Sequence, residues 1–254
     1  MTILPRLCGF LLLGLSLVAS PQTALALSEA DAAALVAAED RTAEDRERDA
    51  RRHPAELLVF SQVGAGMKVA DLGAGNGYTS ELLARAVGPE GTVYAQNSPY
   101  VIEKYVKESW PARLSRGAMK GVIRVDRERG DPLPAEATGL DLITMIYVYH
   151  DTLFTPVDRP AMNAKLLGAL RPGGSLIVVD HHAKPGAGPE IAETLHRMDA
   201  ALLRRELEAA GFEFAAEADF LRHPEDPKEK PFFEMETPTD GFVHRYVKPA
   251  PATD

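Results

Sequence analysis

The chain contains 254 residues, of which 45% are hydrophobic and 26% are charged, a balance that excludes a mainly disordered chain and a polytopic membrane protein. Its 37 acidic and 28 basic residues give a formal charge of −9, so we expect no nucleic-acid partner. The single cysteine, Cys8, excludes both an intrachain disulfide and a cysteine zinc cluster.

Residues 1–26 have the pattern of a signal peptide. Arg6 precedes an apolar run at residues 7–19, which is shorter than the roughly 20 residues of a membrane-spanning helix. The segment 24–26, Ala-Leu-Ala, offers the small residues that a signal peptidase reads. We expect cleavage after Ala26 and a periplasmic or secreted protein without membrane contact. A buried N-terminal helix or an uncleaved anchor is the alternative.

Two helices are expected next. Residues 28–52 are rich in Ala, Glu, Asp and Arg, with Ser28 as a possible N-cap, and their charges are typical of a solvated helix face. Residues 55–63 predict a second, shorter helix. We therefore assign residues 27–63 to an N-terminal helical extension and residues 64–254 to one domain.

From residue 67 onward, short apolar segments alternate with amphipathic ones. Strands are predicted at residues 67–72, 92–95, 121–125, 141–149, 175–180, 212–220 and 241–248. Helices are predicted at residues 79–87, 99–110, 159–170 and 190–210, the last with a break near Asp199, and residues 222–240 read as a long loop. This order predicts an α/β fold with a Rossmann-like, doubly wound, mostly parallel seven-stranded sheet. The last two strands have no helix between them, which predicts an antiparallel edge hairpin at the C-terminus.

A glycine-rich loop follows the first predicted strand. Asp71 ends that strand, and glycines occupy positions 73, 75 and 77 before a helix begins. Glycine allows a sharp turn and a close approach of a ligand to the backbone. The dehydrogenase pattern G-x-G-x-x-G would need glycine at position 78, where Tyr78 stands. The loop is therefore either an ordinary tight turn or a cofactor loop of another kind.

This loop resembles motif I of class I S-adenosylmethionine-dependent methyltransferases. The likeness extends over residues 54–248, since residues 91–97 look like the second strand of that family and residues 170–176 like the turn into its fifth. The segments 149–151 (Tyr-His-Asp), 180–182 (Asp-His-His) and 194–197 (Thr-Leu-His-Arg) are similar to a bacterial group of predicted exported methyltransferase-like proteins. The resemblance implies S-adenosyl-L-methionine as cofactor and a small molecule as methyl acceptor.

The resemblance also implies a set of cofactor-binding residues. They are Asp71, Gly73, Ala74, Gly75, Gly77, Tyr78 and Asn97. Most members of the family carry an acid at the position of Asn97, where it accepts hydrogen bonds from both ribose hydroxyls. Asn97 offers one acceptor oxygen and no charge. A non-catalytic protein that binds S-adenosylmethionine or a nucleoside on the same fold is therefore the first alternative.

Histidines and carboxylates follow the fourth and fifth predicted strands, whose carboxyl ends border ligand sites in doubly wound sheets. We expect His150 or His182 to remove a proton from the methyl acceptor near neutral pH. Asp151 or Asp180 would orient the imidazole. The alternative is that these residues cap helices and bond loop amides.

No metal ligand is assigned in this interpretation. The second alternative is a metal-dependent enzyme of another class, whose ion would lie at the rim of the sheet. That rim consists of His150, Asp180, His181 and His182. His196 is expected on a helix, where we interpret it as a structural histidine.

Overall fold

The computed structural model describes residues 26–251. The predicted signal peptide therefore lies outside the described residues, except for its last residue. Within residues 26–251 no helix has the length and apolar character needed to cross a membrane.

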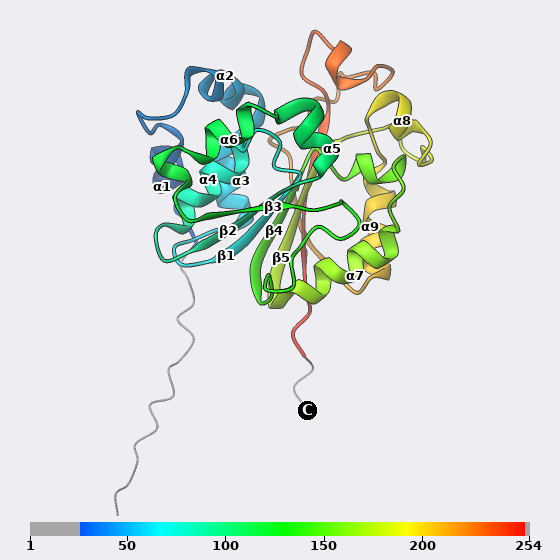
Figure 1. Ribbon diagram of the computed structural model, residues 1–254. Coiled ribbons are helices and arrows are strands. Elements are labelled where there is room, and N and C mark those ends of the chain that lie inside the picture. Colours follow the sequence, from blue (N-terminus) through cyan, green and yellow to red (C-terminus); the bar gives the residue numbers. More distant parts are fainter. Residues whose placement is uncertain (1–25, 252–254) are drawn as a thin grey trace, which may run out of the picture.

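A seven-stranded sheet with the order β3-β2-β1-β4-β5-β7-β6 forms the centre of the molecule (Figure 1). Its strands are Lys68–Leu72 (β1), Thr92–Asn97 (β2), Val122–Asp126 (β3), Leu140–Ile146 (β4), Leu170–His181 (β5), Glu213–Ala218 (β6) and Gly241–Val247 (β7). Strands β1 to β5 run parallel, whereas β7 is antiparallel to both β5 and β6. The predicted fold class is confirmed, and β7 lies between β5 and the edge strand β6.

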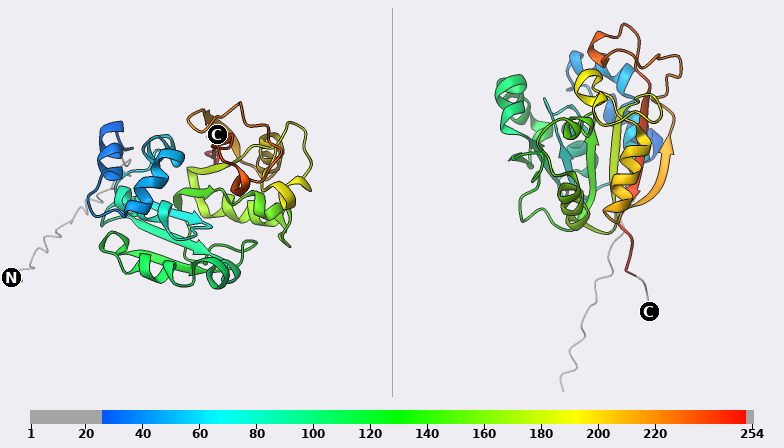
Figure 2. Two further views of the ribbon diagram at one scale, coloured as in Figure 1. Left: turned by 90° about the horizontal axis from the view of Figure 1, so that it is seen from above. Right: turned by 90° about the vertical axis from the view of Figure 1, so that its right-hand side faces the viewer.

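Helices cover both faces of this sheet (Figures 1 and 2). They are Glu29–Val36 (α1), Ala43–Arg52 (α2), Pro54–Ser61 (α3), Tyr78–Val87 (α4), Pro99–Val101 (α5), Ser109–Leu114 (α6), Arg159–Ala169 (α7), Ile191–Leu195 (α8) and Ala200–Ala209 (α9). One hydrophobic cluster joins a face of the sheet to α7 and α9, and a second joins the other face to α1, α3 and α4. The N-terminal extension thus shares a core with the sheet.

Two predicted helices are interrupted in the structure. Residues 28–52 form α1 and α2 instead of one helix, because the Thr42 hydroxyl accepts from the amide of Asp45 and begins a new helix there. Residues 99–110 form α5 and then a π-helix at Ile102–Val106, and α6 begins only at Ser109. Pro111 has no N–H for the carbonyl four residues earlier, which disfavours one continuous α-helix.

The predicted strand at residues 141–149 ends three residues early. Tyr147 has a φ of 58°, which is incompatible with a strand, and a 3-10 helix follows at His150–Leu153. His150 therefore lies beyond the strand, and its orientation does not follow strand alternation.

Candidate functional site

A cavity of about 450 Å³ lies at the carboxyl ends of the parallel strands, between the glycine loop, α2 and residues 221–239. Figure 1 shows α2 and the long segment before β7 at the same end of the sheet. The volume is within the range of small-molecule sites. Five of the predicted cofactor residues line this cavity, namely Asp71, Gly73, Ala74, Gly75 and Tyr78, whereas Gly77 and Asn97 do not.

The three glycines of the loop have different structural roles, although all have positive φ angles. A Cβ at Gly73 would lie 2.5 Å from the Val148 side chain, and one at Gly77 would lie 2.7 Å from Trp110. A Cβ at Gly75 would meet no atom within 4 Å. Packing thus requires the outer two glycines, while the middle one faces open space at the cavity.

Asp71 is buried at the floor of this site. Its carboxylate accepts hydrogen bonds from Ser80 Oγ at 2.6 Å and from Thr144 Oγ1 at 2.8 Å. Burial raises the pKa of Asp71 to about 6, against the opposing effect of these hydrogen bonds and of the Arg52 charge. Asp71 is therefore ionised at neutral pH, at a cost to the stability of the fold.

Asn97 holds the glycine loop, and its expected contact with a ribose is not supported. Its side chain is fully buried; Oδ1 accepts from Gly75 N at 2.8 Å and Nδ2 donates to Gly75 O at 3.0 Å. The neighbouring Gln96 Oε1 accepts from Gly73 N at 3.0 Å. Both amides of this strand end therefore bind the loop backbone, and the Asn97 side chain does not line the cavity.

Helix α2 contributes a cationic wall to the cavity. Arg48, Arg51 and Arg52 all line it. The Arg52 guanidinium carbon lies 5.4 Å from the ring centroid of Tyr78 and 5.1 Å from that of Tyr147, within cation–π range. The charges of this helix were expected on a solvated face, and the sequence pattern did not predict this wall. Only the tertiary position of α2 brings its arginines to the cavity.

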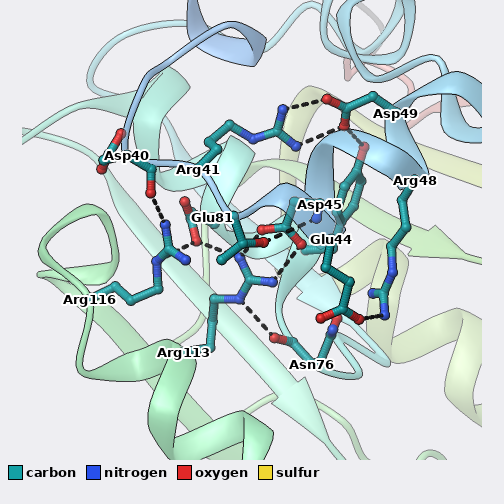
Figure 3. Close-up of polar contacts among 12 residues, drawn as sticks. Asp40, Arg41, Glu44, Asp45, Arg48, Asp49, Asn76, Glu81, Arg113 and Arg116 are labelled. Carbon is teal, nitrogen blue, oxygen red and sulfur yellow. Dashed lines mark hydrogen bonds and ion pairs between the residues drawn. The ribbon is translucent and has the colours of Figure 1, made fainter.

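A buried polar network fixes α2 in this position (Figure 3). Arg113 donates to both carboxylate oxygens of Asp45, at 2.6 and 2.7 Å, and to Glu81 at 2.6 Å. One turn further along α2, Asp49 accepts from Arg41 at 2.6 and 2.8 Å and from the Tyr78 hydroxyl at 2.6 Å. The helix is thereby tied both to α6 and to the start of the helix that follows the glycine loop.

Residues 221–239, the opposite wall of the cavity, are fixed in a similar way. Arg197 and Asp226 form an ion pair at 2.7 Å in which both side chains are fully buried. Arg197 Nε also donates to the carbonyl of Lys230 at 2.8 Å. These buried contacts hold the long loop in a fixed position at the cavity.

His150 does not line the cavity and is only 2% exposed. Its Nδ1 lies 2.7 Å from Asp180 Oδ1, and its Nε2 lies 3.2 Å from Asp151 Oδ1. Burial lowers the pKa of His150, but the charges of Asp180 and Asp151 outweigh this effect and raise it to about 10. His150 lies outside the cavity, and each of its ring nitrogens faces a carboxylate. The expected role of His150 as general base, with Asp151 as its partner, is not supported.

Of the two histidines after β5, only His181 lines the cavity. Its ring is stacked between Tyr147 and Phe232, with centroid distances of 4.4 and 4.8 Å, and its Nδ1 lies 2.8 Å from Thr239 Oγ1. Burial lowers the pKa of His181 to about 3, so the ring is neutral. His182 packs against Phe242 at 5.1 Å and does not line the cavity, which argues against its expected catalytic role.

No protein-family model matches the chain. A protein-L-isoaspartate O-methyltransferase from Aeropyrum pernix is 33% identical over 125 residues. This match covers 48% of the chain and 42% of that protein, so the chain spans less than half of this relative.

Two solved structures support the fold. A SAM-dependent methyltransferase from Aquifex aeolicus gives a TM-score of 0.56 at 20% identity, covering 85% of this chain and 98% of that one. An arsenic(III) S-adenosylmethionine methyltransferase from Chlamydomonas reinhardtii gives a TM-score of 0.55 at 16% identity, covering 88% and 75%. The chain has the class I methyltransferase fold.

Proposed function

We propose that the protein is an S-adenosyl-L-methionine-dependent methyltransferase that acts on a small molecule. The observation that carries this proposal is the position of the glycine loop, which borders a cavity of about 450 Å³ at the carboxyl end of β1. The strand order of the sheet, the A. pernix relative and the two solved structures support it.

The lining of the cavity provides two kinds of group for this reaction. The backbone of the glycine loop at Gly75, with Tyr78 and Asp71, is where the cofactor would lie. Arg48, Arg51 and the neutral ring of His181 provide cationic and uncharged polar groups. Methyl transfer is an in-line displacement that depends on the position of the acceptor. The arginines favour an acceptor that carries a carboxylate or another anionic group.

Binding of the cofactor provides the direct test. Residues 27–254 would be titrated with S-adenosylmethionine and S-adenosylhomocysteine by calorimetry. Gly75→Ala places a methyl group in the open space of the cavity and should weaken binding by about tenfold or more. Gly139→Ala is the matched control, because Gly139 has a φ of 64° against 57° for Gly75, and a Cβ there also meets no atom within 4 Å. Equal effects of both substitutions would contradict the proposed site.

A non-catalytic binding protein is a second candidate, and Asn97 favours it. Its amide is committed to Gly75, so the strand end lacks the acid that accepts from the ribose in most members of the fold family. Incubation with methyl-labelled S-adenosylmethionine and a pool of periplasmic small molecules separates the two candidates. Tight binding of S-adenosylhomocysteine without transfer of label would favour the binding protein.

We also propose that residues 1–26 direct export. Arg6, the apolar run at residues 7–19 and the Ala-Leu-Ala segment at 24–26 support this proposal. Mass spectrometry of the protein from its own cells should find a mature terminus at Leu27. A soluble cytoplasmic protein that retains Met1 would contradict it.

A further inference from the structure

Three side chains outside the cavity converge on one point. His150 Nε2 lies 3.2 Å from Asp151 Oδ1 and 3.4 Å from His196 Nδ1, and the last two atoms are 4.0 Å apart. A circle through three atoms with these separations has a radius of about 2.1 Å, which agrees with Zn–N and Zn–O distances of about 2.0–2.2 Å. One ion can therefore reach all three atoms without movement of the backbone.

Neighbouring side chains bind the other polar atoms of His150 and Asp151, so that Nε2 and Oδ1 face the cluster. Asp180 Oδ1 lies 2.7 Å from His150 Nδ1, so this nitrogen is occupied and Nε2 faces the cluster. A bound cation would displace the proton that the two carboxylates stabilise on Nε2 in its absence. Arg129 donates to Asp151 Oδ2 at 2.7 Å, which leaves Oδ1. A carboxylate behind a ligating histidine is the usual outer partner of a protein-bound metal. Asp180 is itself held by the amides of His150 and His181, both at 2.9 Å.

The backbone and the exposure of the cluster also agree with a ligand site. His196 has a φ of 50°, in the left-handed region that a histidine seldom adopts, and such residues gather at functional sites. The exposed fractions of the side chains are 3% for His150, 20% for Asp151 and 28% for His196. One side of the cluster is therefore accessible to solvent.

We propose that His150 Nε2, Asp151 Oδ1 and His196 Nδ1 bind one divalent transition-metal ion of the Zn²⁺ type. Two imidazoles and one carboxylate suit Zn²⁺ and related ions, whereas Mg²⁺ and Ca²⁺ prefer oxygen donors alone. Three protein ligands leave at least one coordination position for water or a bound molecule. This ligand set differs from the rim expected from the sequence, because Asp180 lies behind His150, and His181 and His182 point elsewhere.

The proposed ion would lie next to the cavity. The ring of Phe232 is 6.1 Å from that of His196 and 4.8 Å from that of His181, and both Phe232 and His181 line the cavity. The metal site depends on its own ligands and not on methyl transfer.

The test measures the metal alone. Residues 27–254 would be treated with a chelator, dialysed and titrated with Zn²⁺ by calorimetry, and elemental analysis would give the stoichiometry. We expect one Zn²⁺ per chain. His196→Gly removes one ligand while fitting the φ of 50°, and Asp151→Asn removes the charged ligand. Each should weaken binding by at least about 100-fold, since loss of an outer partner alone costs about 10- to 100-fold.

His53→Gly is the matched control. His53 also has a positive φ, 45°, and a partly exposed side chain, 35%, but lies outside the cluster. The Zn²⁺ affinity of the His53→Gly variant should equal that of the unchanged protein. Zn²⁺ binding weaker than about 100 µM in the unchanged protein, or unaltered binding in folded His196→Gly, would overturn the proposal. Asp151→Asn decides the question if His196→Gly does not fold.

Discussion

Replacement of Arg113 tests whether buried charges hold α2 over the cavity. Arg113 is the ion-pair partner of Asp45, and the side chains of the two are 7% and 3% exposed. In Arg113→Met the apolar stem stays and the guanidinium is lost. Glu81 would keep Arg85 at 2.9 Å and Arg116 at 3.2 Å, whereas Asp45 would lose its ion pair.

The magnitude follows from the number of carboxylates left without a partner. One buried charge without its partner costs about 3–5 kcal/mol. We therefore expect Arg113→Met to lower the free energy of unfolding by that amount. The double variant Arg113→Met/Asp45→Asn should lose less than Arg113→Met alone, because it no longer buries an unpaired charge. Lys107→Met breaks an exposed pair, with side chains 61% and 71% exposed, and should change stability by less than about 0.5 kcal/mol.

Urea unfolding gives these energies. Circular dichroism and the fluorescence of the single tryptophan, Trp110, should report the same transition if unfolding is two-state. Limited trypsin digestion of the Arg113→Met variant should cleave the arginine-rich helix α2 before other segments, because that helix has lost the ion pair between Asp45 and Arg113. A loss below about 1 kcal/mol for Arg113→Met would refute the reasoning and mean that water reaches Asp45.

Two further substitutions test the cofactor loop. Asn97→Asp should lower the free energy of unfolding by about 2–4 kcal/mol at pH 8, because a buried carboxylate then replaces the amide nitrogen 3.0 Å from the Gly75 carbonyl. The loss should be smaller at pH 5, where the carboxyl takes up a proton. Unchanged stability in urea unfolding would mean that this contact is not formed. Asp71→Asn should be more stable than the unchanged protein at pH 8 by up to about 3 kcal/mol, since a folded pKa of about 6 against 3.8 makes ionisation costly. That gain should disappear below about pH 3, where the pH lies below both pKa values, and equal stability at pH 8 would contradict the raised pKa of Asp71.

The sheet and the glycine loop could be predicted because their causes are local. Apolar runs separated by turn residues give the strands, and the positions of Gly73, Gly75 and Gly77 follow from the backbone angles of one tight turn. The end of β4 was predicted less well. Its apolar run continues to residue 149, but the positive φ of Tyr147 ends the strand, and no residue type in that run indicates it.

The chemistry around the loop depended on contacts between distant segments. Asn97 occupies the predicted position, yet its partner is the backbone of Gly75, which lies 22 residues earlier. His196 was interpreted as structural because it was expected on a helix, but it is the left-handed C-cap of α8 and lies beside His150, 46 residues earlier. Neither contact leaves a periodic or local pattern in the sequence, so neither could be read from it.

The N-terminal extension is best understood as part of the site. In its helix α2, Asp45 and Asp49 bind partners in other segments, whereas Arg48, Arg51 and Arg52 line the cavity. A chain that began at residue 64 would lose the cationic wall and the Asp45 partner of Arg113 at the same time. The helix that looked solvated from its composition therefore links the stability of the fold to the electrostatics of the cavity.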